Sequence, residues 1–137
     1  MKRVLITRRV FPEVVEELRA RFEVEPNDDD HPWPPEELAK RLQGKSGAMA
    51  TVMDKFDEPV LAQCPELKVI SNIAVGYNNI DVAACTRRGI WVTNVMSHWL
   101  VKEAEIEAAR NILDALSGDT PRGAMNQEPV EVLQTAA

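Results

Sequence analysis

Short apolar runs alternate with amphipathic helical patterns along this chain, and that alternation limits the possible folds more than any other feature. The apolar runs predict five strands, at residues 2–7, 22–24, 48–53, 67–73 and 90–93. Helices are predicted after these strands, beginning near Pro12, Glu36, Asp57 and Asn79, with a longer helix at residues 98–116. The first strand is expected to be buried on both faces, because its apolar residues are consecutive. Strands that alternate with helices indicate a parallel sheet covered on both faces.

Five strands in about 120 residues suit a doubly wound, flavodoxin-like α/β fold with strand order 2-1-3-4-5. We expect a single domain, with the sheet core at residues 1–95, a closing helix at 96–117 and a C-terminal tail at 118–137. In this strand order, ligands bind at the carboxyl ends of the first and third strands, where the winding reverses. These ends carry Thr7–Arg9 and Val52–Lys55, and the neighbouring fourth strand ends at Ala74–Tyr77.

Charge and composition exclude several classes of partner. The chain of 137 residues has 16 basic and 22 acidic residues, and its net charge of −6 argues against a nucleic-acid partner. The early apolar run is too short for a signal peptide or a membrane span, so we expect a cytoplasmic protein with no membrane partner. Cys64 and Cys85 are isolated in the sequence and are expected to be buried free thiols.

The motifs of several common chemistries are absent from the sequence. The six glycines form neither a dinucleotide-binding fingerprint nor a phosphate-binding loop, and no nucleophile elbow occurs. Asp54 follows the third strand, as the acceptor of a phospho-receiver domain would, but no acidic partners accompany the first strand to hold Mg²⁺. We therefore predict no catalytic residue, no cofactor and no metal site in this chain.

One turn has the properties of an anion site. Val75–Tyr77 connects the fourth strand to the helix predicted near Asn79, so backbone N–H groups and a helix N-terminus are expected there. Gly76 would let a small carboxylate approach the main chain without a Cβ in the way. The alternative is that Gly76 serves only a tight turn, and the spacing alone does not decide between the two.

The same region carries a family resemblance. Pro65–Val82, which reads PELKVISNIAVGYNNIDV, and Arg88–Asn94, which reads RGIWVTN, resemble the D-2-hydroxyacid dehydrogenases, especially the glyoxylate/hydroxypyruvate reductases. Softer similarities lie at residues 2–8 and 108–128. That family builds a flavodoxin-like substrate domain from both chain ends and inserts a Rossmann NAD(P) domain between them. The resemblance implies that the nucleotide domain is missing here between about Val95 and Glu105, together with the family's catalytic arginine, glutamate and histidine.

The resemblance also implies which residues bind substrate. The main-chain amides of Val75 and Gly76 match the family's carboxylate contacts, and Val52, Met53 and Asp54 match its second substrate loop. Asn78 stands where the family usually has Asp. His98 lacks the family's Thr-Pro-His context, so we do not expect it to be catalytic.

Three functions remain open at this point. The first is an excised or engineered substrate-binding domain that binds a small 2-oxo or 2-hydroxy acid with about millimolar affinity and is not catalytic alone. The second is an NAD(P)-dependent oxidoreductase that needs a nucleotide domain from another chain. The third is an assembly module that forms a homodimer, with Trp99, Leu100 and Val101 as an exposed apolar patch.

Overall fold

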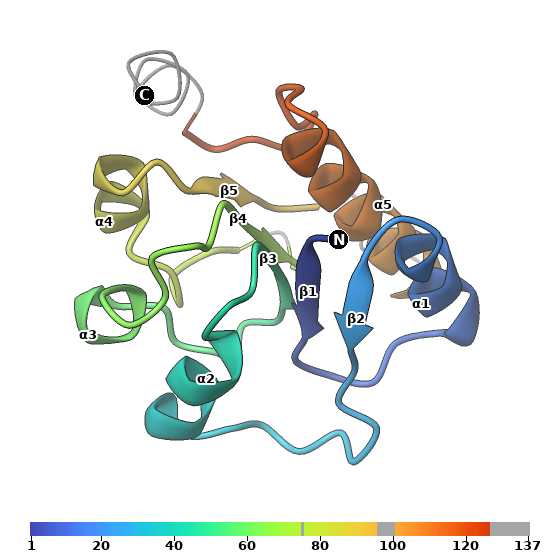
Figure 1. Cartoon of the computed structure of the whole chain (residues 1–137), viewed down its shortest axis with the longest axis horizontal. Helices are drawn as coiled ribbons and strands as arrows, with labels where there is room; N and C mark the ends of the chain where they lie inside the picture. The colour runs from blue at the N-terminus through green and yellow to red at the C-terminus, as the bar shows by residue number, and fades with distance from the viewer. Residues whose placement is uncertain (75, 96–100, 127–137) are drawn as a thin grey trace.

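A five-stranded parallel sheet forms the centre of the molecule. The structure, a computed structural model, describes residues 1–74, 76–95 and 101–126 (Figure 1). All neighbouring strands pair in parallel, in the order β2-β1-β3-β4-β5. The strands are β1 (Arg3–Ile6), β2 (Glu23–Glu25), β3 (Gly47–Ala50), β4 (Val69–Asn72) and β5 (Trp91–Thr93). The predicted flavodoxin-like architecture and its strand order are confirmed.

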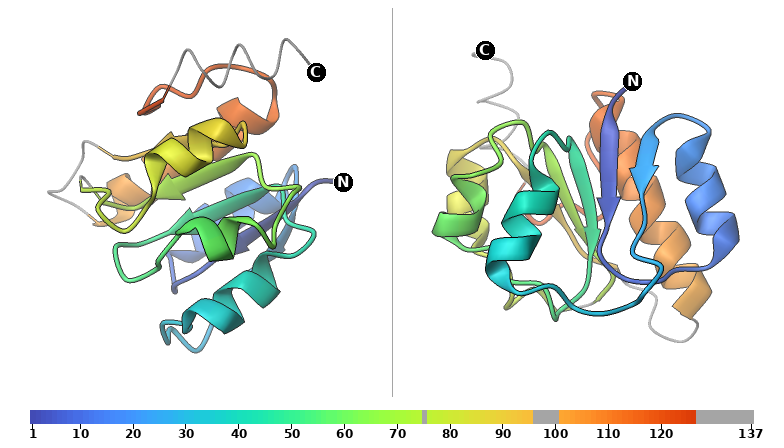
Figure 2. Two further views of the ribbon diagram at one scale, coloured as in Figure 1. Left: turned by 90° about the vertical axis from the view of Figure 1, so that its left-hand side faces the viewer. Right: turned by 60° about the horizontal axis from the view of Figure 1, so that its bottom comes forward.

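Helices cover both faces of this sheet. On one face lie α1 (Pro12–Arg19) and the long α5 (Val101–Leu116); on the other lie α2 (Pro35–Leu42), α3 (Glu58–Leu61) and α4 (Val82–Arg87) (Figure 2). Each face has its own apolar core, because successive residues of a strand point to opposite sides. Val4 and Ile6 of β1 belong to the core beneath α1 and α5, whereas Leu5 belongs to the core beneath the other three helices.

The long helix α5 lies close to the sheet because its inner face is made of small residues. Ala104, Ala108, Ala109 and Ile112 are buried, and Ile106 and Leu113 are half-buried at the margin of the same core. The hydroxyl of Ser71 in β4 donates to the Ala108 carbonyl oxygen at 2.8 Å. The small side chains of Ala104 and Ala108 allow this close approach of the helix to β4. The predicted start of the helix, at residues 96–100, lies outside the described residues.

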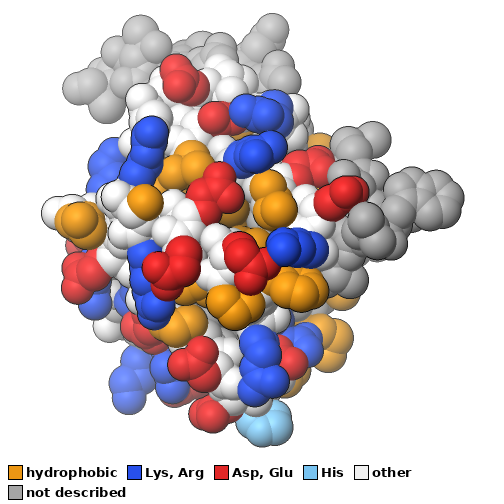
Figure 3. All heavy atoms as spheres, turned by 90° about the vertical axis from the view of Figure 1, so that its right-hand side faces the viewer, with side chains coloured by type: hydrophobic (Ala, Val, Ile, Leu, Met, Phe, Trp, Pro, Cys, Tyr) orange, Lys and Arg blue, Asp and Glu red, His pale blue; other side chains and the backbone are white. Residues whose placement is uncertain are grey.

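The outer surface of α1 and α5 carries intermixed charges rather than a patch of one sign (Figure 3). Ion pairs join the two helices, Glu13 with Lys102 and Glu17 with Arg110. None of the described helices has the length and apolar character needed to cross a membrane.

The segment after α5 lies against the edge strand β5. Ala124 forms an antiparallel bridge with Thr93, and the side chain of Asn126 accepts from Val92 N at 2.9 Å. Gly123 is needed here because a Cβ would lie 2.6 Å from the carbonyl oxygen of Asn94. Of the predicted C-terminal tail at 118–137, residues 127–137 are outside the described part of the chain.

Two predicted boundaries were wrong near the carboxyl edge of the sheet. β3 was expected to continue to Met53, but it ends at Ala50, and the chain turns so that Asp54 N donates to the Thr51 carbonyl oxygen at 3.0 Å. α4 was expected to begin near Asn79, but it begins at Val82 because the Asp81 carboxylate caps it, accepting from Ala84 N at 3.0 Å.

Candidate carboxylate-binding site

The turn after β3 is held by a buried carboxyl group. Asp54 is fully buried, and its Oδ2 accepts from the hydroxyl of Thr7, which follows β1, and from Thr51 N at 3.0 Å. Its other oxygen, Oδ1, has no hydrogen-bond partner among the described residues. Burial raises the pKa of Asp54 above that of an ordinary aspartate, and the hydrogen bonds from Thr7 and Thr51 oppose this rise. The side chain of this predicted site residue therefore secures the turn from inside.

The other two predicted residues of this turn face solvent. The residues Val52 and Met53 are 55% and 60% exposed. Met53 N donates to the hydroxyl of Thr51 at 3.3 Å. The N–H of Val52 has no hydrogen-bond partner within the described part of the chain. The tip of the turn thus offers one unpaired amide beside exposed apolar surface.

Gly76, in the turn after β4, leaves open space above the main chain. A Cβ built at Gly76 would meet no heavy atom within 4 Å. Its backbone is not left-handed, unlike that of Gly44, Gly89 and Gly118, whose φ values are 77°, 72° and 88°. That Gly76 leaves room for a ligand, rather than serving only the turn, stays a prediction. Val75 lies outside the described residues.

A buried asparagine sets the direction of the next peptide group. Asn72, the last residue of β4, donates from Nδ2 to the Gly76 carbonyl oxygen at 2.9 Å. The C=O and N–H of a trans peptide point in opposite directions, so the N–H of Tyr77 is directed away from Asn72. The N–H groups of Gly76 and Tyr77 have no partner among residues 1–74, 76–95 and 101–126. Unpaired, accessible amides of this kind can bind an anion.

The two turns are linked by Asn79. Its Nδ2 donates to the carbonyl oxygens of Thr51 at 3.0 Å and Asp54 at 2.8 Å. Its Oδ1 accepts from Asn72 Nδ2 at 3.1 Å. The structure therefore brings together the two predicted segments, 52–54 and 76–77. Thr7 was placed at this edge from the sequence, but its bond to Asp54 and the roles of Asn72 and Asn79 were not predicted; the available signal was that Thr7 and Asn72 are polar residues at the ends of apolar runs.

Nearby charges contribute less to the site than was expected. Arg8 donates from Nε to Asp30 Oδ1 at 2.9 Å, and this hydrogen bond lowers the pKa of Asp30. The positive end of α4 was expected to assist the turn at Gly76, but this helix begins six residues later, at Val82. A helix dipole acts mainly within its terminal turn, so backbone amides, rather than the helix, define this site.

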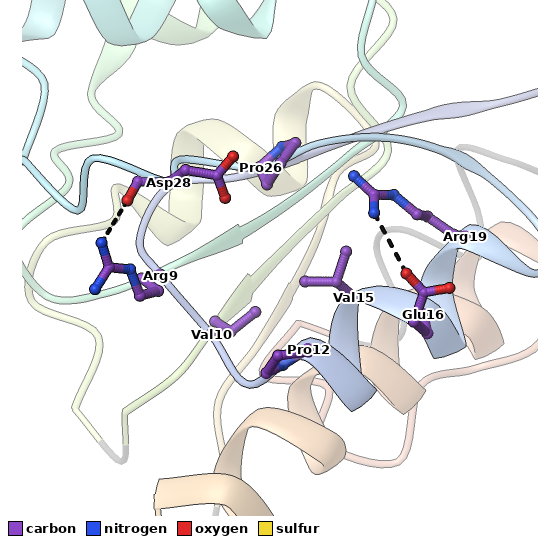
Figure 4. A pocket seen from close by; sticks show the side chains of 8 residues that line it. All are labelled: Arg9, Val10, Pro12, Val15, Glu16, Arg19, Pro26 and Asp28. Carbon is purple, nitrogen blue, oxygen red and sulfur yellow. Dashed lines mark hydrogen bonds and ion pairs between the residues drawn. The ribbon is translucent and has the colours of Figure 1, made fainter.

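A hollow of about 320 Å³ lies beside the β1–α1 loop but does not coincide with this site. Its charged groups are already engaged: Arg9 donates to the Asp28 carbonyl oxygen at 2.7 Å, and Arg19 lies 3.3 Å from Glu16 (Figure 4). Val15 and other apolar side chains form the rest of its wall. In this hollow Arg19 is paired with Glu16, and the guanidinium of Arg9 donates to a backbone carbonyl group.

Other predicted residues are structural or lie outside the described chain. Cys64 and Cys85 are free and buried, as predicted, and burial raises their pKa values to about 11 and about 12. The described residues contain no cluster of side chains suited to a metal ion. His98, Trp99 and Leu100 lie outside the described residues, as does the side chain of Val101.

Comparison with known families gives independent information about these loops. The model of the D-isomer specific 2-hydroxyacid dehydrogenase, catalytic domain, matches residues 4–100, which include both turns of the candidate site. This chain belongs to that family. The resemblance carried by residues 65–82 and 88–94 is confirmed.

Members of the family that resemble this chain are much longer. The glyoxylate reductase of Aeropyrum pernix is 36% identical over 119 residues, covering 82% of this chain and 36% of that relative. The glyoxylate reductase of Thermococcus kodakarensis is 38% identical over 92 residues, covering 67% and 28%. This chain therefore spans about a third of the length of the curated relatives that it matches.

Solved structures show the same relationship. A Polaromonas sp. JS6 66 structure assigned to the NAD-binding D-isomer specific 2-hydroxyacid dehydrogenases has a TM-score of 0.68 and 32% identity, over 71% of this chain and 31% of that chain. The NADPH-dependent glyoxylate/hydroxypyruvate reductase of Sinorhizobium meliloti, solved in complex with citrate, has a TM-score of 0.55 and 27% identity, over 71% and 29%.

Proposed function

We propose that this chain is an excised or engineered substrate-binding domain that binds a small 2-oxo or 2-hydroxy acid, such as glyoxylate, and is not catalytic alone. The observation that carries the proposal is the open main chain at Gly76, where the amides of Gly76 and Tyr77 are unpaired among the described residues. Such N–H donors bind a carboxylate especially well, because a charged acceptor makes a stronger hydrogen bond. The names of the glyoxylate reductases and the citrate complex of the S. meliloti relative support the same ligand class.

Weak affinity follows from the composition of the site. Its donors are neutral amides, whereas Arg8 and Arg9 are engaged by Asp30 and Asp28. A net charge of −6 adds a general repulsion toward anions. We therefore expect a dissociation constant of about 1 mM, which corresponds to roughly −4 kcal/mol.

The described residues do not fit the NAD(P) that the family implies. A dinucleotide needs glycines at a strand-to-helix turn, where the pyrophosphate meets backbone amides. The turn between β1 and α1, Thr7–Phe11, has no glycine, and Arg8 and Arg9 are held by acidic residues and a carbonyl group. We assign no redox step to this chain. The free thiols of Cys64 and Cys85 agree with a cytoplasmic location.

The test is an NMR titration of the ¹⁵N-labelled chain with glyoxylate and with glycolate. The amide signals of Val52, Gly76 and Tyr77 are expected to shift with saturation in the millimolar range. Glycolamide, which lacks the carboxylate, is the matched ligand control and is expected to shift none of them. No shift with either acid at about 50 mM would overturn the proposal. Oxidation of NAD(P)H by the purified chain in the presence of glyoxylate would overturn its non-catalytic part.

A homodimer is a second candidate role, favoured by exposed hydrophobic side chains. Phe11, Val52, Met53 and Tyr77 are 40–60% exposed and belong to the segments that follow β1, β3 and β4. Exposed apolar surface at one edge of a sheet favours association with a partner. A second copy, or a nucleotide domain on another chain, could cover these side chains, and light scattering of the pure chain distinguishes self-association from a need for another protein.

A further inference from the structure

The side chain of Asn79 uses its hydrogen-bonding groups between the two turns of the candidate site. It donates to the carbonyl oxygens of Thr51 and Asp54, at 3.0 and 2.8 Å, at the two ends of the turn after β3. Its remaining contacts are with Asn72, since the two side-chain amides pair at 3.1 and 3.3 Å. Asn79 itself lies in the segment after β4, so its side chain ties that segment to the turn after β3 and to the end of β4.

Asn72 extends this connection to the second turn. It is fully buried at the end of β4, and it donates to the Gly76 carbonyl oxygen at 2.9 Å. A continuous series of hydrogen bonds therefore leads from Thr51 and Asp54, through Asn79 and Asn72, to Gly76. The last bond also fixes the Gly76–Tyr77 peptide with its N–H directed away from Asn72.

We propose that Asn79, acting through Asn72, is the positioning residue of the acid-binding site: it sets the spacing of the two turns and directs the Tyr77 amide toward the ligand. This inference rests on the proposed function, because it assumes that the two turns bind one acid. Asparagine suits the position because its amide has two donors for the two carbonyl groups and an acceptor for Asn72. Aspartate would place a negative oxygen against the same carbonyl groups.

The sheet beneath the turns does not need this side chain. β3 and β4 pair through their backbones from Gly47 with Val69 to Ala50 with Asn72. The main chain of Asn79 and Asp81 is bonded to Phe56: Phe56 N donates to the Asn79 carbonyl oxygen, and Asp81 N donates to the Phe56 carbonyl oxygen, each at 2.9 Å. Loss of the side-chain amide is therefore expected to loosen the turns while the core stays folded.

The neighbouring residue gives a matched control. Asn78 is exposed, and its side chain has no hydrogen-bond partner among the described residues. Asn79→Ala is expected to raise the dissociation constant for glycolate by about tenfold, since the side-chain bonds to the turn after β3 and to Asn72 are lost. Asn78→Ala is expected to leave it within about twofold. Asn79→Asp keeps the size of the side chain and is expected to behave as Asn79→Ala does.

Amide hydrogen exchange without ligand separates this inference from the proposed function. Asn79→Ala is expected to speed exchange in both turns, at residues 51–55 and 76–79, while the strand amides keep their protection. If the native chain binds no acid but Asn79→Ala still loosens both turns, the proposed function fails and the positioning role stands. If Asn79→Ala binds glycolate as the native chain does, or leaves both turns unchanged, the positioning role is refuted. It is also refuted if Asn79→Ala and Asn79→Asp both unfold, because Asn79 would then support the whole fold.

Discussion

Gly76→Ala is expected to preserve the fold and to remove most of the acid binding. The added methyl group would meet no heavy atom within 4 Å, and the backbone at Gly76 is not left-handed. Replacing glycine with alanine, where alanine can adopt the native conformation, reduces the conformational entropy of the unfolded chain. The free energy of unfolding is therefore expected to rise by about 0.4–1 kcal/mol. The same methyl group would occupy the open space through which the carboxylate reaches the main chain.

The loss of affinity follows from the contact that the methyl group displaces. A hydrogen bond to a charged group contributes about 1.5–3 kcal/mol. Since about 1.4 kcal/mol corresponds to a tenfold change, the dissociation constant for glycolate is expected to rise by roughly 10- to 150-fold. Urea unfolding measures the stability, and the NMR titration with glycolate measures the affinity.

Gly123→Ala is the opposite control. A Cβ at Gly123 would lie 2.6 Å from the Asn94 carbonyl oxygen and 2.9 Å from Asn111 Nδ2, so there is no room for it. It is expected to destabilise the fold by about 1–3 kcal/mol, while the folded fraction binds glycolate normally. Unchanged binding by Gly76→Ala would refute the reasoning that the ligand approaches the main chain there. Unfolding of Gly76→Ala would instead show that the turn itself requires glycine.

Three further expectations concern the buried carboxyl group, the thiols and the exposed edge. Because the pKa of Asp54 is raised in the folded state, the free energy of unfolding is expected to fall as the pH rises from the ordinary pKa of an aspartate to the raised one. Urea unfolding at several pH values measures this fall, and Asp54→Asn is expected to remove it. The same pH dependence in Asp54→Asn as in the native chain would contradict this assignment. Cys64 and Cys85, with pKa values of about 11 and about 12, are expected to resist a thiol reagent near neutral pH until urea unfolds the chain, so rapid labelling of the native protein would show that they are accessible. Multi-angle light scattering is expected to show a homodimer that Met53→Lys shifts toward monomer, and a native chain that is monomeric at high concentration would remove this role.

The sheet could be predicted because its central strands are apolar on both faces. Val4–Ile6 in β1 and Val69–Ile70 in β4 have no polar alternation, which is typical of parallel strands between two helix layers. The end of β3 could not be predicted in the same way. Val52 and Met53 continue the apolar run but are exposed, and hydrophobicity alone does not distinguish a buried residue from one that faces a ligand or partner.

The site could be predicted only in part. Gly76 and the segment 52–54 were predicted to lie together because they follow strands that end at the same edge; that they bind a ligand stays a prediction. The roles of Asn72 and Asn79 could not be found, because the partners of a side-chain amide depend on which loops the fold brings within about 3 Å. The start of α4 was misplaced because Asn79 is a good capping residue by type, but Asp81 performs that role.

The position of α5 late in the sequence has a consequence for folding during synthesis. This helix, which ends at Leu116, supplies Ala108 and Ile112 to the same apolar core as Val4, Met49 and Val69. Until α5 has left the ribosome, α1 is the helix that covers this face, and the part of the face formed by β3 and β4 remains exposed to water. Completion of this apolar core must therefore wait until α5 has emerged, and a nascent form that stops before α5 would expose apolar surface to which chaperones can bind.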